Sequence, residues 1–143
     1  MTQKLKIFNQ ENIYLTYSSL SFLVPGFYGL LHKEFMLSPL LINGSLISYF
    51  FWKDPRYNLQ RSLDIYFVNG SALIFGYHSF FKIKNQKIKY TINSLYTMAA
   101  LCFLNACNYY YQHKPYWFHY HLAFHGCSLV GHFINVFSKV HHF

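Results

Sequence analysis

The sequence predicts an all-α fold: a polytopic membrane bundle of about five transmembrane helices within a single domain, residues 1–143. Composition is the first reason, because 53% of the residues are hydrophobic and 22% aromatic while only 11% are charged. An ordinary soluble domain carries about 25% charged residues. Arrangement is the second reason, because apolar segments alternate with short polar or basic stretches. Each apolar segment has about 20 residues, the length that crosses a hydrocarbon core.

Five apolar segments follow one another along the chain. Pro25 lies inside the first and is expected to kink it, because proline lacks the amide hydrogen that a helix interior needs. The stretches between segments are too short to hold another domain, so consecutive segments are expected to lie antiparallel. The predicted helices cover residues 13–31, 36–52, 63–81, 92–110 and 117–137.

The basic residues favour lipid over nucleic acid as the partner. The net charge is +8, but lysines and arginines fall between the apolar segments and do not form one stripe interleaved with aromatics. A nucleic-acid footprint would require such a stripe, whereas basic residues between apolar segments are typical of membrane loops. The sequence therefore predicts an integral, multi-pass membrane protein that contacts membrane lipid and binds no nucleic acid.

The last apolar segment contains several histidines. Ionisable side chains in a membrane span are costly and usually face a bundle interior or a cavity. His121 and His125 are four residues apart, which places both imidazoles on one face of a helix, one turn apart. This spacing suits metal ligands, and hydrogen bonding between helices is the alternative for the pair. His119 is expected at the membrane interface.

Other polar residues are expected at the same end of an antiparallel bundle. Ser45 and Ser48 lie near the end of the second segment, and Asp64 opens the third. A carboxylate, a serine and two histidines can together bind or activate a water. Plainer roles are also open: Asp64 would suit the first turn of a helix, and the serines would allow close helix packing.

The spacing of these residues resembles the CREST superfamily, which includes alkaline ceramidases and the progestin/adiponectin-receptor proteins. The similar pattern runs Ser48-x3-Trp52, then Asp64 twelve residues later, then His121-x3-His125. The resemblance implies that histidines hold zinc and that Asp64 and Ser48 position the attacking water. It also implies that the bond hydrolysed is the amide of a ceramide-like lipid.

The chain departs from the family pattern in two ways. Family members have seven spans, and they have a histidine where this chain has Trp52. An indole donates a hydrogen bond and cannot ligate a metal. The predicted zinc ligands are therefore His121, His125 and Asp64, since zinc sites of two histidines and a carboxylate exist. The predicted catalytic residues are Ser48 and Asp64.

Three functions remain open from the sequence. The first is a zinc-dependent membrane hydrolase of a lipid amide or ester, or an inactive relative of one. The alternative is a non-catalytic small membrane subunit of a larger complex, organellar or otherwise, in which the histidines bond to neighbouring protein groups and an outer helix face is apolar. A third is haem binding between His78 and His132, which are predicted at similar depth.

Overall fold

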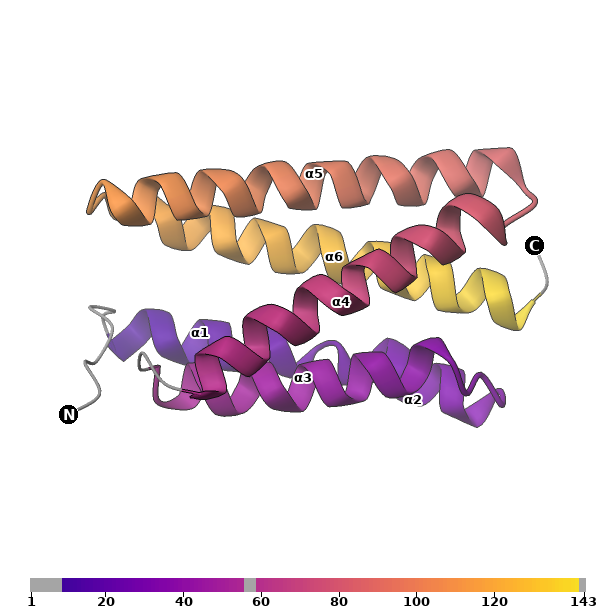
Figure 1. The fold of residues 1–143 in the computed structure, drawn as a ribbon, viewed down its shortest axis with the longest axis horizontal. Coiled ribbons are helices and arrows are strands. Elements are labelled where there is room, and N and C mark those ends of the chain that lie inside the picture. Colours follow the sequence, from indigo (N-terminus) through magenta and orange to yellow (C-terminus); the bar gives the residue numbers. More distant parts are fainter. Residues whose placement is uncertain (1–8, 56–58, 142–143) are drawn as a thin grey trace. The chain divides into compact units, whose positions relative to one another are not determined.

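Six helices make up most of the computed structural model, which describes residues 9–55 and 59–141 (Figure 1). Residues 1–8, 56–58 and 142–143 of the predicted domain lie outside the described residues. The helices are α1 (Asn9–Leu20), α2 (Leu23–Leu31), α3 (Leu37–Lys53), α4 (Leu59–Phe81), α5 (Gln86–Tyr111) and α6 (Trp117–Val140). Turns connect them, and the described residues contain no β-strand. The all-helical part of the predicted fold class is confirmed.

The first predicted segment consists of two helices, α1 and α2. The hydroxyl groups of Ser18 and Ser19 both donate to the carbonyl oxygen of Leu15, at 3.0 and 2.8 Å. Serines that bond to nearby backbone offer the chain an alternative to continuing a helix. Pro25 then lies in the first turn of α2, where a missing amide hydrogen costs little. The chain therefore breaks before the proline and is not kinked at it.

None of the helices formed by the described residues is long and apolar enough to cross a membrane. The predictions of a transmembrane bundle and of an integral, multi-pass location are therefore wrong. Three helices are short, with 12 residues in α1, 9 in α2 and 17 in α3. The longer helices contain polar residues among the apolar ones. Examples in α4 are Arg61, Asp64 and Asn69.

The chain divides into two compact units, Met1–Phe75 and Gly76–Phe143, where the sequence predicts a single domain. The boundary falls inside α4, so this helix contributes its first part to unit 1 and its last part to unit 2.

In unit 1, α1 and α2 pack against α3. Leu15, Leu37 and Leu41 form the centre of this core, each at most 5% exposed. The start of α3 is fixed by the buried carboxylate of Glu34. This carboxylate accepts hydrogen bonds from the amides of Met36, Leu37 and Ser38 and from the Ser38 hydroxyl, at 2.6 to 3.1 Å. These amides have no partner within the helix, so the carboxylate satisfies them and complements the helix dipole.

In unit 2, α5 and α6 pack side by side along their length (Figure 1). The Asn85 side chain caps the start of α5 by accepting from the amide of Ile88 at 3.3 Å. Gly131 of α6 allows the closest approach, since a Cβ there would lie 2.6 Å from the ring of Tyr96 on α5. A residue without a side chain is therefore required where the two helices meet this ring.

Candidate active site

Ser48 and Asp64 form a hydrogen-bonded pair in unit 1. Ser48 is on α3, and its hydroxyl donates to the Oδ1 atom of Asp64 on α4. The two residues are 16 apart in the sequence, and the antiparallel arrangement of consecutive segments accounts for their meeting. Asp64 is the sixth residue of α4, beyond the first turn. The plainer role for this carboxylate, stabilising a helix start, is therefore wrong.

A close contact one turn along holds the two helices together at this pair. A Cβ on Gly44 of α3 would lie 3.3 Å from the ring of Phe67 on α4. Gly44 precedes Ser48 by one turn and Phe67 follows Asp64 by about one turn, as expected for helices that run in opposite directions. The absent side chain at Gly44 lets the helices approach closely enough for the serine to reach the carboxylate.

Asp64 is buried, with 9% of its surface exposed. Burial disfavours the charged form and raises the pKa of this carboxyl group to about 6, although the hydrogen bond from Ser48 partly opposes the rise. A carboxyl group with a pKa near neutrality suits general acid–base catalysis, because it accepts and returns a proton at physiological pH. Perturbed pKa values of this kind are found most often at functional sites.

Two other residues predicted near the pair have structural roles. The Ser45 hydroxyl donates to the backbone carbonyl of Ser19 at 2.7 Å, so it joins α3 to α1 and does not face Asp64. Trp52 is 7% exposed and packs against the ring of Phe51 at a centroid distance of 4.8 Å. Its indole therefore serves the core of unit 1.

His121 and His125 lie on one face of α6 in unit 2, and their ring centroids are 5.0 Å apart. Aromatic rings surround them: the ring of Phe124 lies within 5.6 Å of both, and Phe103 and Trp117 lie near His121. Burial in this apolar setting lowers the pKa of His121 to about 4. Burial, and then the neighbouring His121, lower the pKa of His125 well below its ordinary value. Both imidazoles are therefore neutral at pH 7. His119 is exposed.

The described residues contain no group of three or more histidine, cysteine, aspartate or glutamate side chains that could hold a metal ion. Zinc binding therefore stays a prediction. His121 and His125 offer two nitrogen ligands, whereas a structural or catalytic zinc takes at least three protein ligands. Trp52 leaves the third position without a donor, and Asp64 is bonded to Ser48. The described residues therefore do not supply a complete set of zinc ligands.

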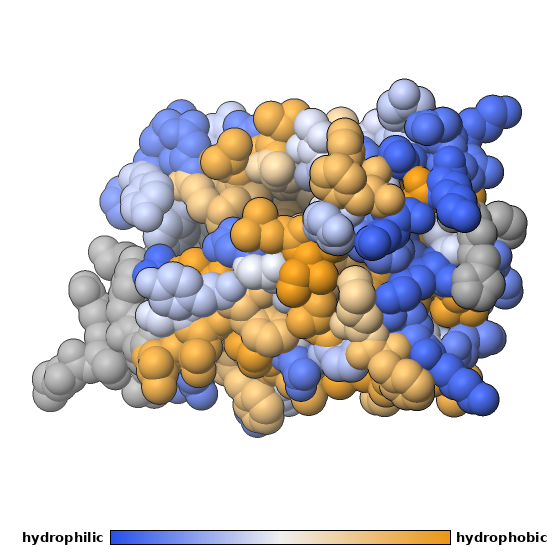
Figure 2. All heavy atoms as spheres, turned by 45° about the vertical axis from the view of Figure 1, so that its right-hand side comes forward, coloured by the Kyte–Doolittle hydropathy of each residue, from blue (hydrophilic) through white to orange (hydrophobic). Residues whose placement is uncertain are grey.

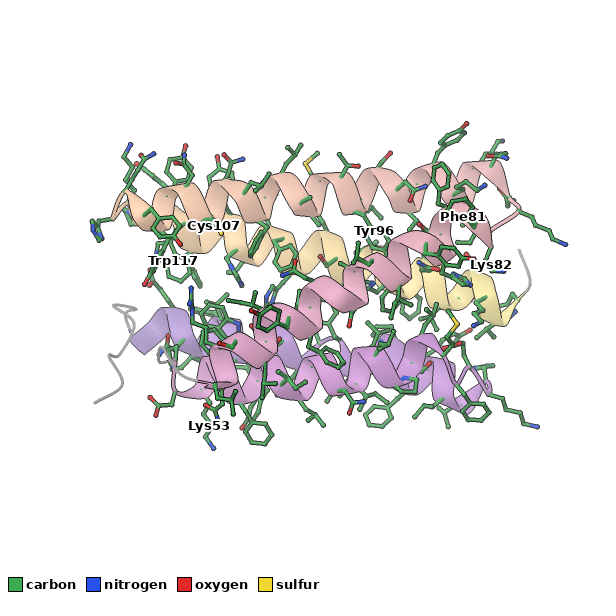
Figure 3. The ribbon with its side chains drawn as sticks, viewed as in Figure 1. Lys53, Phe81, Lys82, Tyr96, Cys107 and Trp117 are labelled. Carbon is green, nitrogen blue, oxygen red and sulfur yellow. The ribbon has the colours of Figure 1, made fainter. Side chains whose placement is uncertain are left out.

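Unit 2 contains a second buried polar cluster, which we call the histidine network: His78, Tyr96, His132 and Asn135. The Nδ1 atom of His78 lies 2.6 Å from Oδ1 of Asn135, and Nδ2 of Asn135 donates to the Tyr96 hydroxyl at 3.1 Å. That hydroxyl lies 3.0 Å from Nδ1 of His132 (Tyr96 is labelled in Figure 3). The network joins α4, α5 and α6.

The hydrogen-bond partner of His78 fixes its tautomer. An amide oxygen can only accept, so Nδ1 of His78 carries the proton. Burial lowers the pKa of His132 to about 3 and raises that of Tyr96. Neutral His132 can accept a hydrogen bond from the Tyr96 hydroxyl when its own proton is on Nε2.

Sequence reasoning paired His78 with His132 by depth and missed Asn135, which is fully buried between them. Its sequence signal is a lone amide within the apolar stretch Phe133–Phe137. Buried amides need partners, so such a residue predicts a polar neighbour on another helix.

Comparison with models of known protein families, with characterised proteins and with solved structures finds no match for this chain. The resemblance to the CREST superfamily therefore stays a prediction.

Proposed function

We propose that this chain hydrolyses an ester or amide bond in an apolar, lipid-like substrate, with Asp64 as the general base and Ser48 as the residue that positions it. The observation that carries the proposal is the Ser48–Asp64 hydrogen bond to a buried carboxyl group whose pKa is raised to about 6. At pH 7 most of this group is ionised, and its basicity exceeds that of an ordinary aspartate.

The proposed reaction uses one water and returns every proton. Asp64 removes a proton from the water as the water oxygen bonds to the substrate carbonyl carbon. When the tetrahedral intermediate collapses, the bond to the leaving oxygen or nitrogen breaks, and Asp64 gives the proton to that atom. The Ser48 hydroxyl is hydrogen-bonded to one carboxylate oxygen of Asp64 and thereby fixes the orientation of the other.

The surroundings of the pair support an apolar substrate. Leu46 and Phe50 on α3 are 40% and 54% exposed, and Leu63 and Tyr66 on α4 are 49% and 78% exposed. These side chains lie within two residues of Ser48 or Asp64 and give both helices an apolar outer surface. An acyl chain can bury against such a surface.

The test is hydrolysis of a fluorogenic long-chain ester and an N-acyl amide by the purified chain. Asp64→Asn is expected to lower kcat by about a hundredfold or more, which is the usual contribution of a general base. Asp54→Asn removes another carboxylate of unit 1 and is expected to leave the rate unchanged. No turnover of either substrate by the wild-type chain, or full activity in Asp64→Asn, would overturn the proposal.

A second candidate function, a non-catalytic subunit of a larger complex, is favoured by unit 2. His78 and His132 are used in a hydrogen-bonded network, as a structural role requires. Leu101, Leu104 and Met98 on α5 are more than half exposed, and Figure 2 shows apolar residues in orange at the surface. This function predicts that the chain forms an assembly of defined mass and that Leu104→Ser prevents its formation. A native mass of 17.1 kDa, that of one chain, would contradict it.

A further inference from the structure

Unit 2 carries positive charge without any acidic side chain. Residues 76–143 contain no aspartate or glutamate and no arginine, but they contain six lysines. Four of these lysines, at positions 82, 84, 87 and 89, lie within the turn from α4 to α5 and the first turn of α5. Lys82, Lys84 and Lys87 are exposed and Lys89 is half-buried.

Exposed aromatic rings lie among these lysines. Phe80 and Phe81, at the end of α4, are 58% and 66% exposed. The ammonium group of Lys89 lies 5.8 Å from the centroid of the Phe80 ring, and that of Lys82 lies 6.0 Å from the Tyr77 ring. Figure 3 shows Phe81 and Lys82 together at the end of α4. We call Phe80, Phe81 and Lys82, Lys84, Lys87 and Lys89 the basic–aromatic end.

Buried contacts hold the basic–aromatic end in place. Ile83, between two of the lysines, is only 2% exposed. The Ser79 hydroxyl donates to Oδ1 of Asn93 at 2.7 Å and joins α4 to α5, while His78 joins α4 to Asn135 of α6. The exposed rings and ammonium groups are therefore presented by an ordered part of the fold, which lowers the entropy cost of binding through them.

We propose that the basic–aromatic end binds an anionic lipid surface. Lysine ammonium groups are attracted to the negative potential of such a surface, and exposed phenylalanine rings can bury at the boundary between headgroups and acyl chains. A nucleic-acid surface is disfavoured because unit 2 has no arginine, the side chain best suited to bidentate phosphate recognition. Contact through surface side chains requires no spanning helix, and it does not depend on the Ser48–Asp64 chemistry.

The test is co-sedimentation of the full chain with vesicles of phosphatidylcholine alone or mixed with phosphatidylserine. Binding is expected only to the mixed vesicles. The triple variant Lys82→Gln, Lys84→Gln, Lys87→Gln is expected to bind about a hundredfold more weakly, since each lysine near an anionic surface contributes about fivefold. The double variant Phe80→Ser, Phe81→Ser is expected to weaken binding even at low salt, where attraction by charge alone is strongest.

A matched control removes the same charge elsewhere. Lys33→Gln, Lys53→Gln, Lys114→Gln leaves the basic–aromatic end intact, and its binding is expected to fall much less than that of the first triple variant. Circular dichroism establishes that each variant is folded. If both triple variants lose vesicle binding equally, net charge alone explains the binding and the proposal is overturned. Absence of vesicle binding, or binding of a DNA duplex that the phenylalanine variant retains in full, would also overturn it.

Discussion

Carboxylates and imidazoles are divided between the two units of this chain. All four acidic side chains precede residue 76, whereas eight of the nine histidines follow it. Burial acts on the two kinds of group in opposite directions: it raises the pKa of Asp64 in unit 1 and lowers the pKa of His121 and His132 in unit 2. Burial keeps each of these groups closer to its neutral form. Asp64 and these two histidines therefore respond to pH with opposite sign.

A second contrast lies within unit 1. Glu34 and Asp64 are both buried carboxyl groups. Glu34 accepts four hydrogen bonds at a helix start, whereas Asp64 accepts a hydrogen bond from Ser48. Donors that compensate for lost water make a buried carboxylate a fixed structural group. The smaller compensation at Asp64 leaves it suited to exchanging protons.

The largest expected effect is acid destabilisation through unit 2. A histidine whose folded pKa is depressed contributes stability above its unfolded pKa of about 6.5, and this stability is lost as pH falls towards the folded value. For His121, with a folded pKa of about 4, the loss is about 3 kcal/mol by pH 4. Urea unfolding at pH 7 and pH 4 measures it.

His121→Phe keeps an aromatic ring in the same apolar setting and is expected to reduce the acid loss by that amount. His119→Gln, which changes an exposed histidine on the same helix, is the matched control variant. An unchanged pH dependence in His121→Phe would break the contrast between the units.

Next in size is Gly131→Ala, which is expected to lower the free energy of unfolding by about 1 to 3 kcal/mol, because overpacking forces side chains out of position. The new Cβ would meet the Tyr96 ring at 2.6 Å and disturb the histidine network. Gly126→Ala, on the same helix with nothing within 4 Å, should stabilise by about 0.5 to 1 kcal/mol through helix propensity. Thermal unfolding of both variants compares them directly, and equal effects would contradict the role assigned to Gly131.

Neutralising the two buried carboxyl groups of unit 1, Asp64 and Glu34, is expected to change the free energy of unfolding in opposite directions. Asp64 has a raised folded pKa, so stability falls as pH rises from about 4 to above 6. Asp64→Asn should therefore stabilise the chain at pH 8 by about 2 kcal/mol and not at pH 4. Glu34→Gln should destabilise by about 1 to 2 kcal/mol, because charged hydrogen bonds at the helix start are lost. Destabilisation of similar size in both variants would remove the contrast between these two groups.

The smallest expected effect is a shift in the pH profile of hydrolysis. The bond from Ser48 lowers the pKa of Asp64 against the effect of burial, so Ser48→Ala should move the midpoint of activity to higher pH. The rise of kcat/KM with pH reports this value in the unbound enzyme. If Ser48→Ala lowers the maximum of kcat/KM but leaves the midpoint pH unchanged, the role of Ser48 is structural only.

Local spacing predicted more of this molecule than hydropathy did. The HxxxH spacing places His121 and His125 one turn apart, and antiparallel succession accounts for the meeting of Ser48 with Asp64. Apolar length suggested spanning helices, but the polar residues within those segments leave no described helix apolar enough. Asn135 has its partners on other helices, and no local pattern specifies such contacts. The break between α1 and α2 depends on serine-to-backbone bonds, which compete closely with helical ones.

The order of atoms in the histidine network determines what it can transmit. Two successive hydrogen bonds point the same way: from His78 to Asn135 and from Asn135 to Tyr96. Such aligned dipoles reinforce one another. Proton hopping, however, requires every link to take up one proton and release another at low cost. An amide accepts at oxygen and donates from nitrogen, so a relay through Asn135 would leave its side chain as the unfavourable imidic acid tautomer. Asn135 therefore insulates one imidazole from the other: the chain of bonds can clamp three helices together, but it cannot conduct a proton between them.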